Sequence, residues 1–295
     1  MTDKHNISDW MRGLQDRICR ALEEADGLGR FVEDAWTRPG GGGGRTRTLC
    51  NGNIIEKGGV NFSEVYGELT ERAGTALGIA AGPFFATGVS IVQHPCSPMV
   101  PIIHMNIRYF EAANTYWFGG GIDLTPHYVF REDARWFHQQ LRAVCDQFDL
   151  GFYPKYKAEA DDYFFIKHRN ETRGVGGIFF DRVSENNEIS RETLWQFTQA
   201  VGNAFAPIYT ELMRRNASKP FTEKERDWQL IRRGRYAEFN LAIDRGTRFG
   251  LETDGRTESI LMSLPPLAKW EYNHLPEPNT AEAETLTWLR KGVTY

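Results

Sequence analysis

The sequence of 295 residues lacks the marks of several broad classes of protein. It has no excess of basic residues, because 35 Lys and Arg stand against 39 Asp and Glu, which gives a formal net charge of −4. Proteins that bind nucleic acids usually carry a basic surface, so this charge argues against general binding of DNA or RNA. It leaves room for a small acidic ligand, since a few well-placed arginines set the local field.

Cysteines are few, and long apolar runs are missing. The four cysteines form no Cys-x-x-Cys pair, so we expect reduced thiols rather than a disulfide framework; they are Cys19, Cys50, Cys96 and Cys145. No apolar run approaches the roughly 18–20 residues of a membrane-spanning helix. Acidic residues interrupt the amino-terminal segment, which does not resemble a targeting peptide. We therefore expect a cytoplasmic protein that does not span a membrane.

Familiar cofactor motifs are also missing. The run Gly40–Gly44 is followed by Arg45-Thr46-Arg47-Thr48, whereas a phosphate-binding P-loop ends in Gly-Lys-Ser or Gly-Lys-Thr. We interpret the run as a mobile loop near an anionic substrate, because consecutive glycines have no backbone preference. No glycine-rich stretch has the strand–turn–helix setting of a flavin or nicotinamide site. The histidines lack His-x-His and His-x₃-His spacing, so spacing alone does not indicate a metal site.

The hydrophobic pattern predicts one α+β domain without internal repeats or linkers. Helical periodicity predicts helices over residues 8–26, 131–148, 155–168, 190–215 and 222–233. Strand-like segments fill residues 45–111, most clearly 87–93 and 102–110, and a short strand is expected over 177–181. We further predict a β-hairpin over residues 235–251 and a strand over 259–264.

The segment from Ile103 to Phe110 is the most informative. Alternate side chains of a strand share a face, so His104, Asn106 and Arg108 lie together along roughly 13 Å at about 3.3 Å per residue. A solvated outer face is the simpler interpretation. We favour a ligand-binding face, because the polar side has none of the Lys, Glu or Thr residues typical of solvent-facing strands.

Two neighbouring segments extend this face. Ser90 and His94 share one parity in the preceding strand, and they join the row if the two strands pair across the intervening prolines. Asp123 follows three glycines and lies between apolar residues. It is either the cap of a helix that begins near Pro126 or a partly desolvated carboxylate that faces N–H donors of a ligand.

Five long strings resemble the oxygen-dependent coproporphyrinogen-III oxidase family. They occur in order within about residues 45–272 and are GVSIVQHPCSPMVPIIHMNIRYF, WFGGGIDLTPHY, YFFIKHRNETRGVGGIFFD, RRGRYAEFNLAIDRGTRFGL and GRTESILMSLPPLAKWEY. Strings of this length are far more specific than one short motif. One departure from the family pattern is the pair Cys96-Ser97, in a turn where a basic or polar pair is usual.

The resemblance implies a single domain over residues 1–295, with a large antiparallel sheet flanked by helices on both faces. It also implies the activity: two propionates of coproporphyrinogen III become vinyl groups, which gives protoporphyrinogen IX in heme biosynthesis. Molecular oxygen is the co-substrate, and no organic cofactor is needed. The resemblance further implies a homodimer, with residues 236–271 in its interface. Two other functions stay open, an iron-dependent oxygenase and a non-catalytic tetrapyrrole carrier.

Site residues follow from the same resemblance, position by position. His104 is the candidate acid/base, and Asp123 is the carboxylate expected to face the pyrrole nitrogens. The positions that match substrate contacts are Ser90, Asn106, Ile107, Arg108, Asp254, Gly255 and Arg256. Some members of the family bind a divalent metal through four histidines and others work without one. The matching histidines are His94, His104, His138 and His168. Taken singly, His138 also suits a helix boundary and His168 a helix carboxyl end.

Overall fold

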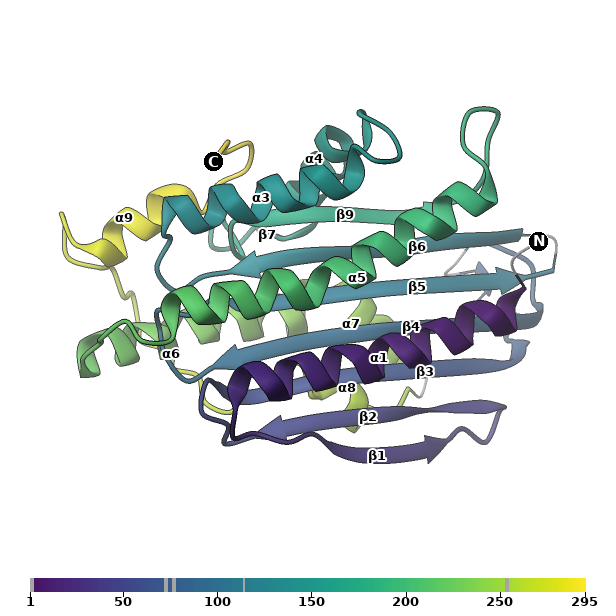
Figure 1. Cartoon of the computed structure of the whole chain (residues 1–295), viewed down its shortest axis with the longest axis horizontal. Coiled ribbons are helices and arrows are strands. Elements are labelled where there is room, and N and C mark those ends of the chain that lie inside the picture. Colours follow the sequence, from purple (N-terminus) through teal and green to yellow (C-terminus); the bar gives the residue numbers. More distant parts are fainter. Residues whose placement is uncertain (1–2, 72–73, 76–77, 114, 253–254) are drawn as a thin grey trace.

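The computed structural model describes residues 3–71, 74–75, 78–113, 115–252 and 255–295. At its centre is a seven-stranded antiparallel sheet in the order β1-β2-β3-β4-β5-β6-β9 (Figure 1). The strands are β1 (Val32–Thr37), β2 (Gly42–Cys50), β3 (Ile55–Leu69), β4 (Gly82–Pro95), β5 (Ile102–Ala112), β6 (Thr115–Thr125) and β9 (Gly176–Val183). A separate ladder joins β7 (Phe165–Ile166) and β8 (Glu171–Thr172). The first six strands form a meander, because short connections suffice between antiparallel neighbours.

Helices close one face of the sheet. α1 (Lys4–Asp26), α3 (Arg131–Cys145) and α5 (Arg191–Asn216) lie across the near face in Figure 1. Met11 and Leu14 belong to the buried stripe of α1 and share one core cluster with Ile103, Met105 and Ile107 of β5. Full burial of a side chain of this size contributes about 1.5–3 kcal/mol. This apolar layer therefore fixes the sheet from one side.

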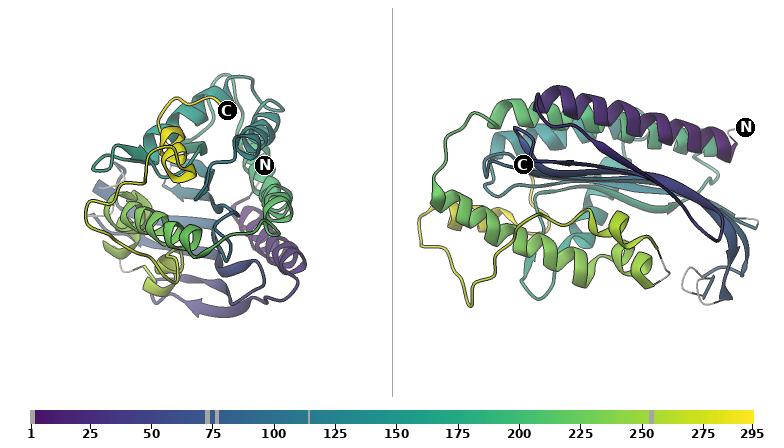
Figure 2. Two further views of the ribbon diagram at one scale, coloured as in Figure 1. Left: turned by 90° about the vertical axis from the view of Figure 1, so that its left-hand side faces the viewer. Right: turned by 90° about the horizontal axis from the view of Figure 1, so that it is seen from below.

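The other face is covered only in part. α6 (Glu223–Glu238), the π-helical turn η1 (Phe239–Ile243), α7 (Arg245–Glu252) and α8 (Thr257–Leu261) lie on that side, as the right-hand view of Figure 2 shows. α4 (Phe152–Tyr163) flanks edge strand β9, and α9 (Ala281–Trp288) follows near the carboxyl end. The predicted α+β fold, with helices on both faces of a large antiparallel sheet, is confirmed. No helix within the described ranges is long and apolar enough to cross a bilayer.

The segment predicted as a hairpin over residues 235–251 is helical instead. α6 continues to Glu238, and η1 and α7 follow it. Tyr236 packs edge-on against His94, and Phe239 packs against Phe164. These buried residues are three apart, a spacing that also suits a helix, and the contacts with distant segments decide between the two structures. The predicted strand over 259–264 is likewise wrong, because α8 occupies Thr257–Leu261.

Two smaller predictions are also corrected. The helix expected over residues 155–168 ends at Tyr163, and the short β7–β8 ladder follows it. The glycines Gly42–Gly44 are not a loop but the first residues of β2, paired with both β1 and β3. A Cβ at Gly43 would lie 2.2 Å from the carbonyl oxygen of Trp36. Neighbouring strands thus impose an extended conformation on Gly43 and Gly44 that these glycines alone do not favour.

Candidate active site

The polar residues of β5 line the partly open face of the sheet. His104, Asn106 and Arg108 are partly exposed, whereas the intervening Met105 and Ile107 are fully buried. This alternation confirms the prediction that the three polar side chains share one face. It also explains their position, because α6, η1, α7 and α8 cover this side incompletely.

The row of polar residues continues across the sheet. Ser90 of β4 lies opposite Asn106, which confirms the predicted pairing of these strands. Asn61 lies opposite Ser90, Thr46 opposite Asn61, and Asp34 opposite Thr46. Directly opposed residues of antiparallel strands point to the same face. A register-aligned polar row therefore runs from edge strand β1 to β5.

Glycines keep the neighbouring part of this face flat. Gly88 and Gly119 lie opposite Arg108 on the two adjoining strands, and Gly121 lies opposite Asn106. A Cβ at Gly119 would come within 2.9 Å of Nε of Arg108. The Arg108 side chain therefore lies across the backbone of β6, a close approach that Gly119 allows because it has no side chain.

His104 and Asp123 are opposed residues of β5 and β6. Nδ1 of His104 lies 2.8 Å from Oδ1 of Asp123. An ionised carboxylate only accepts hydrogen bonds, so Nδ1 carries the proton and Nε2 is the nitrogen left for a ligand. The His104 side chain is 22% exposed and that of Asp123 is 1% exposed. His104 thus presents its ring to the open face, while the buried Asp123 lies beside it on the neighbouring strand.

Arg173, from the segment between β8 and β9, neutralises Asp123. Its Nη2 lies 2.7 Å from Oδ1 and its Nε 3.2 Å from Oδ2 of the carboxylate. Burial alone would raise the pKa of Asp123, but the Arg173 charge and the His104 hydrogen bond hold that pKa below its ordinary value. Asp123 is therefore a buried carboxylate with both oxygens occupied.

Three aromatic rings enclose the Arg173 guanidinium. The ring centroids of Phe164, Tyr236 and Phe239 lie 4.4, 4.9 and 4.5 Å from its Cζ. The Arg173 side chain is only 2% exposed. Because a buried charge is stable only when it is paired, Arg173 and Asp123 depend on each other.

This geometry changes both interpretations of Asp123 that its local sequence allows. Asp123 is not a helix cap, because it lies within β6 and the next helix, α3, begins at Arg131. Direct contact with a ligand does not match its 1% exposure or its two occupied oxygens. Its side-chain contacts are with Arg173 and with His104, and of these two only His104 is partly exposed on the open face.

Arg108 is held farther along the same row. Its Nη1 donates to Oδ1 of Asn106 at 2.8 Å, and its Nη2 donates to Oδ1 of Asp181 at 2.6 Å. Asp181 lines a pocket of about 440 Å³ between α4, β9 and the start of α7. Pockets for small molecules commonly measure about 300–1,000 Å³. The pocket borders the row of polar residues at the β9 edge of the sheet.

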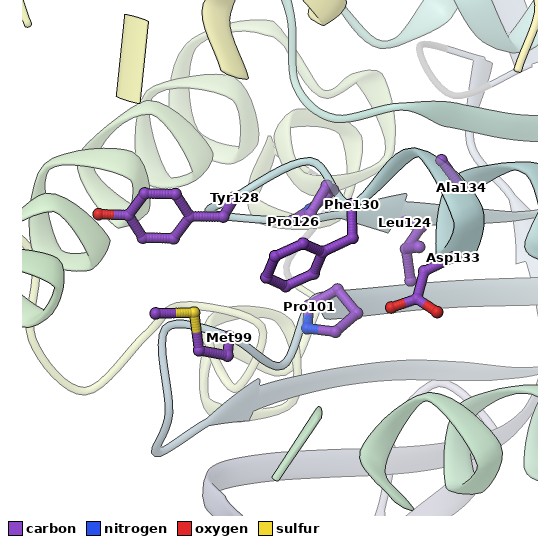
Figure 3. Close-up of a pocket in the computed structure, with 8 residues that line it drawn as sticks. All are labelled: Met99, Pro101, Leu124, Pro126, Tyr128, Phe130, Asp133 and Ala134. Atoms are coloured by element: carbon purple, nitrogen blue, oxygen red, sulfur yellow. The ribbon is translucent and has the colours of Figure 1, made fainter. Parts of the chain in front are cut away.

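A second hollow is too small for any substrate. It lies beyond the end of β6 and is lined by residues that include Met99, Leu124, Tyr128 and Phe130 (Figure 3). Its volume is about 10 Å³, which is roughly the space of one water molecule. We interpret it as imperfect packing rather than a binding site.

The remaining predicted contacts are dispersed. Asp254 lies outside the described residues, and the side chain of Ile107 is buried on the opposite face. Arg256, which follows Gly255 just before α8, forms an ion pair with Asp34 at the β1 end of the polar row. β1 and β5 are four strand positions apart, or roughly 19 Å at about 4.8 Å per strand. Arg256 and Arg108 therefore lie far apart over one face.

The four histidines of the expected metal site do not converge. Within the described ranges, no three His, Cys, Asp or Glu side chains gather in a way that could hold a metal ion. His94 is buried with its Nε2 2.8 Å from the Ser263 carbonyl oxygen, and burial lowers its pKa to about 3. Both nitrogens of His138 are occupied, one by the Val175 carbonyl and one by the Tyr153 hydroxyl. These placements do not fit a four-histidine centre.

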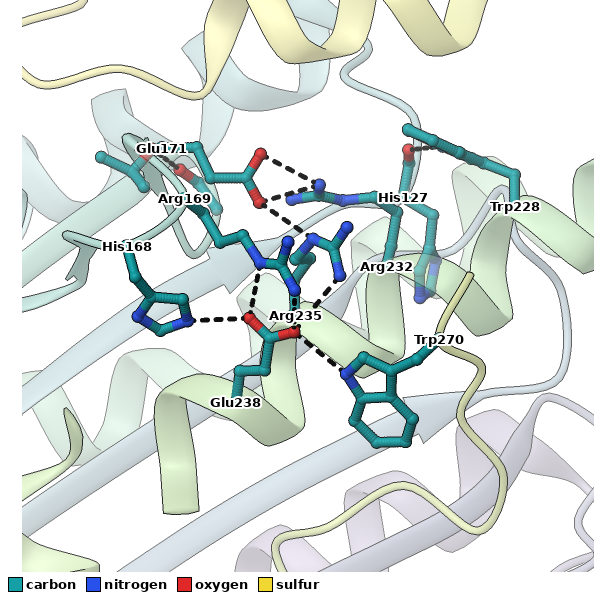
Figure 4. Close-up of polar contacts among 11 residues, drawn as sticks. His127, His168, Arg169, Glu171, Trp228, Arg232, Arg235, Glu238 and Trp270 are labelled. Atoms are coloured by element: carbon teal, nitrogen blue, oxygen red, sulfur yellow. Dashed lines mark hydrogen bonds and ion pairs between the residues drawn. The ribbon is translucent and has the colours of Figure 1, made fainter. Parts of the chain in front are cut away.

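His168 belongs to a different cluster (Figure 4). Its Nε2 lies 2.9 Å from Oε2 of Glu238, the last residue of α6. Arg169 and Trp270 also donate to Glu238, and Figure 4 shows all three side chains pointing at its carboxylate. The histidine is thus the partner of a carboxylate that ties three segments together.

Arg173 and Asp181 are the functional candidates that the sequence did not reveal. Both occur in the string YFFIKHRNETRGVGGIFFD, where neither shows a periodic signal. One indirect signal existed for Arg173. An aspartate between apolar residues in a strand needs a cation when it is buried, but the sequence does not say which one.

Comparison with known proteins places the sequence in a family. The family model described as coproporphyrinogen III oxidase matches residues 6–295. A curated oxygen-dependent coproporphyrinogen-III oxidase from Prochlorococcus marinus (strain NATL2A) is 51% identical, in a match that covers 92% of this chain and 84% of the relative. The chain therefore belongs to the coproporphyrinogen III oxidase family.

Proposed function

We propose that this protein oxidatively decarboxylates two propionates of coproporphyrinogen III to vinyl groups, with O₂ as co-substrate, and so produces protoporphyrinogen IX for heme biosynthesis. The observation that carries the proposal is the His104–Asp123–Arg173 chain beside Arg108 on an open, glycine-floored sheet face. The family and the 51% identical relative support the same reaction.

The polar row suits a wide, flat polyanion. The substrate carries four propionates, and Arg108 and Arg256 lie over opposite parts of the row. A charge-assisted hydrogen bond from such an arginine contributes about 1.5–3 kcal/mol. Ser90 and Asn106 offer neutral partners between the two charges. We propose that the macrocycle lies over the glycines, where the flat backbone allows close approach.

His104 is the proposed acid/base, and Asp123 and Arg173 are positioning residues. Because Asp123 accepts from Nδ1, the ring is fixed with Nε2 toward the open face. Arg173 keeps Asp123 charged, since its guanidinium compensates the burial of the carboxylate. A positioned acid/base contributes about 10²–10⁴-fold to a rate.

The chemistry needs no organic cofactor, because the reduced tetrapyrrole is itself electron-rich. At each reacting side chain, the carbon attached to the ring loses a hydrogen with its electron pair, and O₂ accepts both. With one further proton, O₂ becomes hydrogen peroxide. The outer carbon then loses CO₂, and the electrons of that bond complete the vinyl group. His104 is the group placed near the reacting propionate to supply the proton that completes hydrogen peroxide. The histidines named for a metal do not share a site, so no step is assigned to a metal.

The decisive experiment is anaerobic incubation of the protein with coproporphyrinogen III, followed by addition of O₂. We expect a divinyl product with two equivalents of CO₂ and of hydrogen peroxide. His104→Ala should lower turnover by about 10²–10⁴-fold, with folding checked by circular dichroism. His5→Ala, in α1 on the opposite side of the sheet, is the matched control. Near-normal turnover of His104→Ala would remove its assignment. Tight binding without O₂ consumption would indicate a carrier, and co-purifying iron whose removal abolishes activity would indicate an iron oxygenase.

We also propose that the protein works as a homodimer through residues 236–271. Six of the eleven exposed large apolar side chains among the described residues lie in or just after this segment. They are Leu241, Leu251, Leu267, Trp270, Tyr272 and Leu275. Exposed apolar side chains concentrated in one segment commonly mark a protein interface.

A cytoplasmic location is part of the same proposal. All four cysteines are free thiols, and Cys19 and Cys145 are buried. Free thiols are typical of reducing compartments. Cell fractionation with an antibody against the chain tests this location.

A further inference from the structure

Asp181 forms an ion pair with Arg108, which is the cation that the proposed function assigns to a substrate propionate. Nη2 of Arg108 lies 2.6 Å from Oδ1 of Asp181, the shortest contact that either side chain makes with another charged residue. The two side chains are 37% and 32% exposed. An ion pair this open to solvent contributes little to stability. Its position beside the polar row therefore calls for another explanation.

The backbone around Asp181 is arranged to bring its carboxylate to Arg108. β6 pairs irregularly with β9 between Phe118 and Gly120. At the intervening Gly119, any Cβ would lie 2.9 Å from Nε of Arg108. A side chain at this position would therefore block the path of Arg108 across β6.

Arg182, the residue after Asp181, adopts φ 51°, a left-handed conformation that is unfavourable for a residue with a side chain. Its N–H donates to Oδ1 of Asp181 at 3.1 Å, so the strained residue holds the carboxylate in place. Such strain persists only where the surrounding structure imposes it, and it is frequent at functional sites.

The ion pair also borders open space. Asp181 lines the pocket of about 440 Å³, whose wall includes the stacked rings of Tyr163 and Phe179, with centroids 4.0 Å apart. Arg245 lies over the Tyr163 ring at 5.1 Å and lines the same pocket. A carboxylate that enters from the pocket or from the polar row therefore meets an Arg108 whose Nη2 already binds Asp181.

We propose that Asp181 is a specificity-determining residue that competes with the substrate for Arg108. This inference rests on the proposed function. On binding, a propionate takes the place of the Asp181 carboxylate on Nη2, so one anion replaces another on the same cation. After decarboxylation the side chain is a neutral vinyl group, and Asp181 pairs with Arg108 again. The exchange weakens binding of the substrate, because only the fraction of molecules with a free Arg108 is competent. The return of Asp181 to Arg108 also favours release of a side chain that has already become a vinyl group.

Asp181→Asn tests this exchange in the full-length protein, with steady-state turnover of coproporphyrinogen III. We expect KM to fall about three- to fivefold, the range expected when a half-exposed ion pair is broken. We expect kcat to fall as well, because Arg108 stays free to hold other propionates of the product. Asp181→Glu keeps the charge and should restore both constants toward those of the wild type.

The control is Asp162→Asn. Asp162 lines the same pocket, but its carboxylate pairs with Lys291 and not with an arginine of the polar row. Its KM should stay within about twofold of the wild type, since only a surface pair is lost. An equal fall in KM in both variants would overturn the proposal. The fall would then come from the loss of any negative charge in the pocket, and not from competition for Arg108. A KM that is unchanged or raised in Asp181→Asn would overturn it as well.

Coproporphyrin III, the oxidised and unreactive tetracarboxylate, provides a second readout that does not need turnover. Its dissociation constant, measured by fluorescence quenching, should fall by the same factor in Asp181→Asn. The change should vanish in an Arg108→Gln background, where no cation is left to compete for. A change that persists there would contradict the exchange. Absence of turnover in the wild type would instead remove the proposed function itself.

Discussion

At the scale of single residues, the buried Arg173–Asp123 pair has a desolvation cost, and it fixes the orientation of His104. Transfer of each charge out of water costs several kcal/mol, and attraction within the pair offsets this only when the geometry is good. Here the same carboxylate oxygen accepts from Arg173 and from His104. The pair is therefore better explained by the orientation it gives the His104 ring than by a contribution to stability.

Separate removal of the two charges tests this explanation. Arg173→Gln should lower the free energy of unfolding by about 3–5 kcal/mol, because Asp123 loses its partner in a buried site. The double variant Arg173→Gln/Asp123→Asn should regain part of that loss, since no charge stays buried. Turnover should be about 10²-fold or more below the wild type in both, because neither keeps a charged carboxylate fixed against His104. Urea unfolding and steady-state turnover provide the measurements.

Arg214→Gln is a suitable control for the loss of an arginine. Arg214 is 72% exposed and pairs with Glu211 on the surface of α5, so its loss should change the free energy of unfolding by less than about 1 kcal/mol. Normal turnover in the double variant would contradict a positioning role for Asp123 and Arg173.

At the scale of elements, the strands that carry the site and the first part of α6 are predictable, whereas η1, α7 and α8, which complete the cover, are not. Alternation over residues 102–110 places His104, Asn106 and Arg108 on one face, because the strand period is two. The helical structure of residues 235–251 depends on contacts with distant segments, such as that of Tyr236 with His94. Arg173 lies 50 residues from Asp123 along the chain. Neither contact leaves a local pattern in the sequence.

The Glu238 cluster of Figure 4 connects elements that the sequence keeps apart. Burial would raise the pKa of Glu238, but hydrogen bonds from Arg169, His168 and Trp270 lower it from 4.5 to about 2. The folded state thus binds this proton more weakly than the unfolded chain. The stabilisation is complete above about pH 4.5 and is lost as the pH falls toward 2.

Glu238→Gln should therefore lower Tm most at pH 6, and its difference from the wild type should shrink between pH 5 and pH 3, because the unfolded wild-type chain takes up a proton at this carboxylate there while the folded state still keeps it charged. Differential scanning calorimetry at each pH provides the measurement. Glu24→Gln, at an exposed position of α1, should follow the wild type throughout. A difference for Glu238→Gln that stays constant down to pH 3 would show that charge is not the source of its stabilisation.

At the scale of the whole molecule, one sheet serves two purposes. Its face toward α1, α3 and α5 is a continuous apolar core, and its other face carries a polar row from Asp34 to Asn106. The row exists because five strands pair in register, and a shift of one residue in any of them would turn its side chain to the other face. The sequence predicts the part of the row on neighbouring strands β4 and β5. It does not predict the contributions of β1 to β3, because their register depends on pairings across the entire sheet.

The exposed apolar side chains of residues 241–275 concern the assembly of whole molecules, because a partner subunit would bury them. We predict a particle with twice the mass of one chain in size-exclusion chromatography with light scattering. Leu241→Glu/Leu267→Glu should shift it to the monomer, since a charge buried in an apolar interface has no partner. The control Leu28→Glu/Leu150→Glu changes two leucines that are 66% and 76% exposed outside this segment, and it should stay dimeric. If both double variants dissociate, or if neither does, the interface lies elsewhere on the molecule.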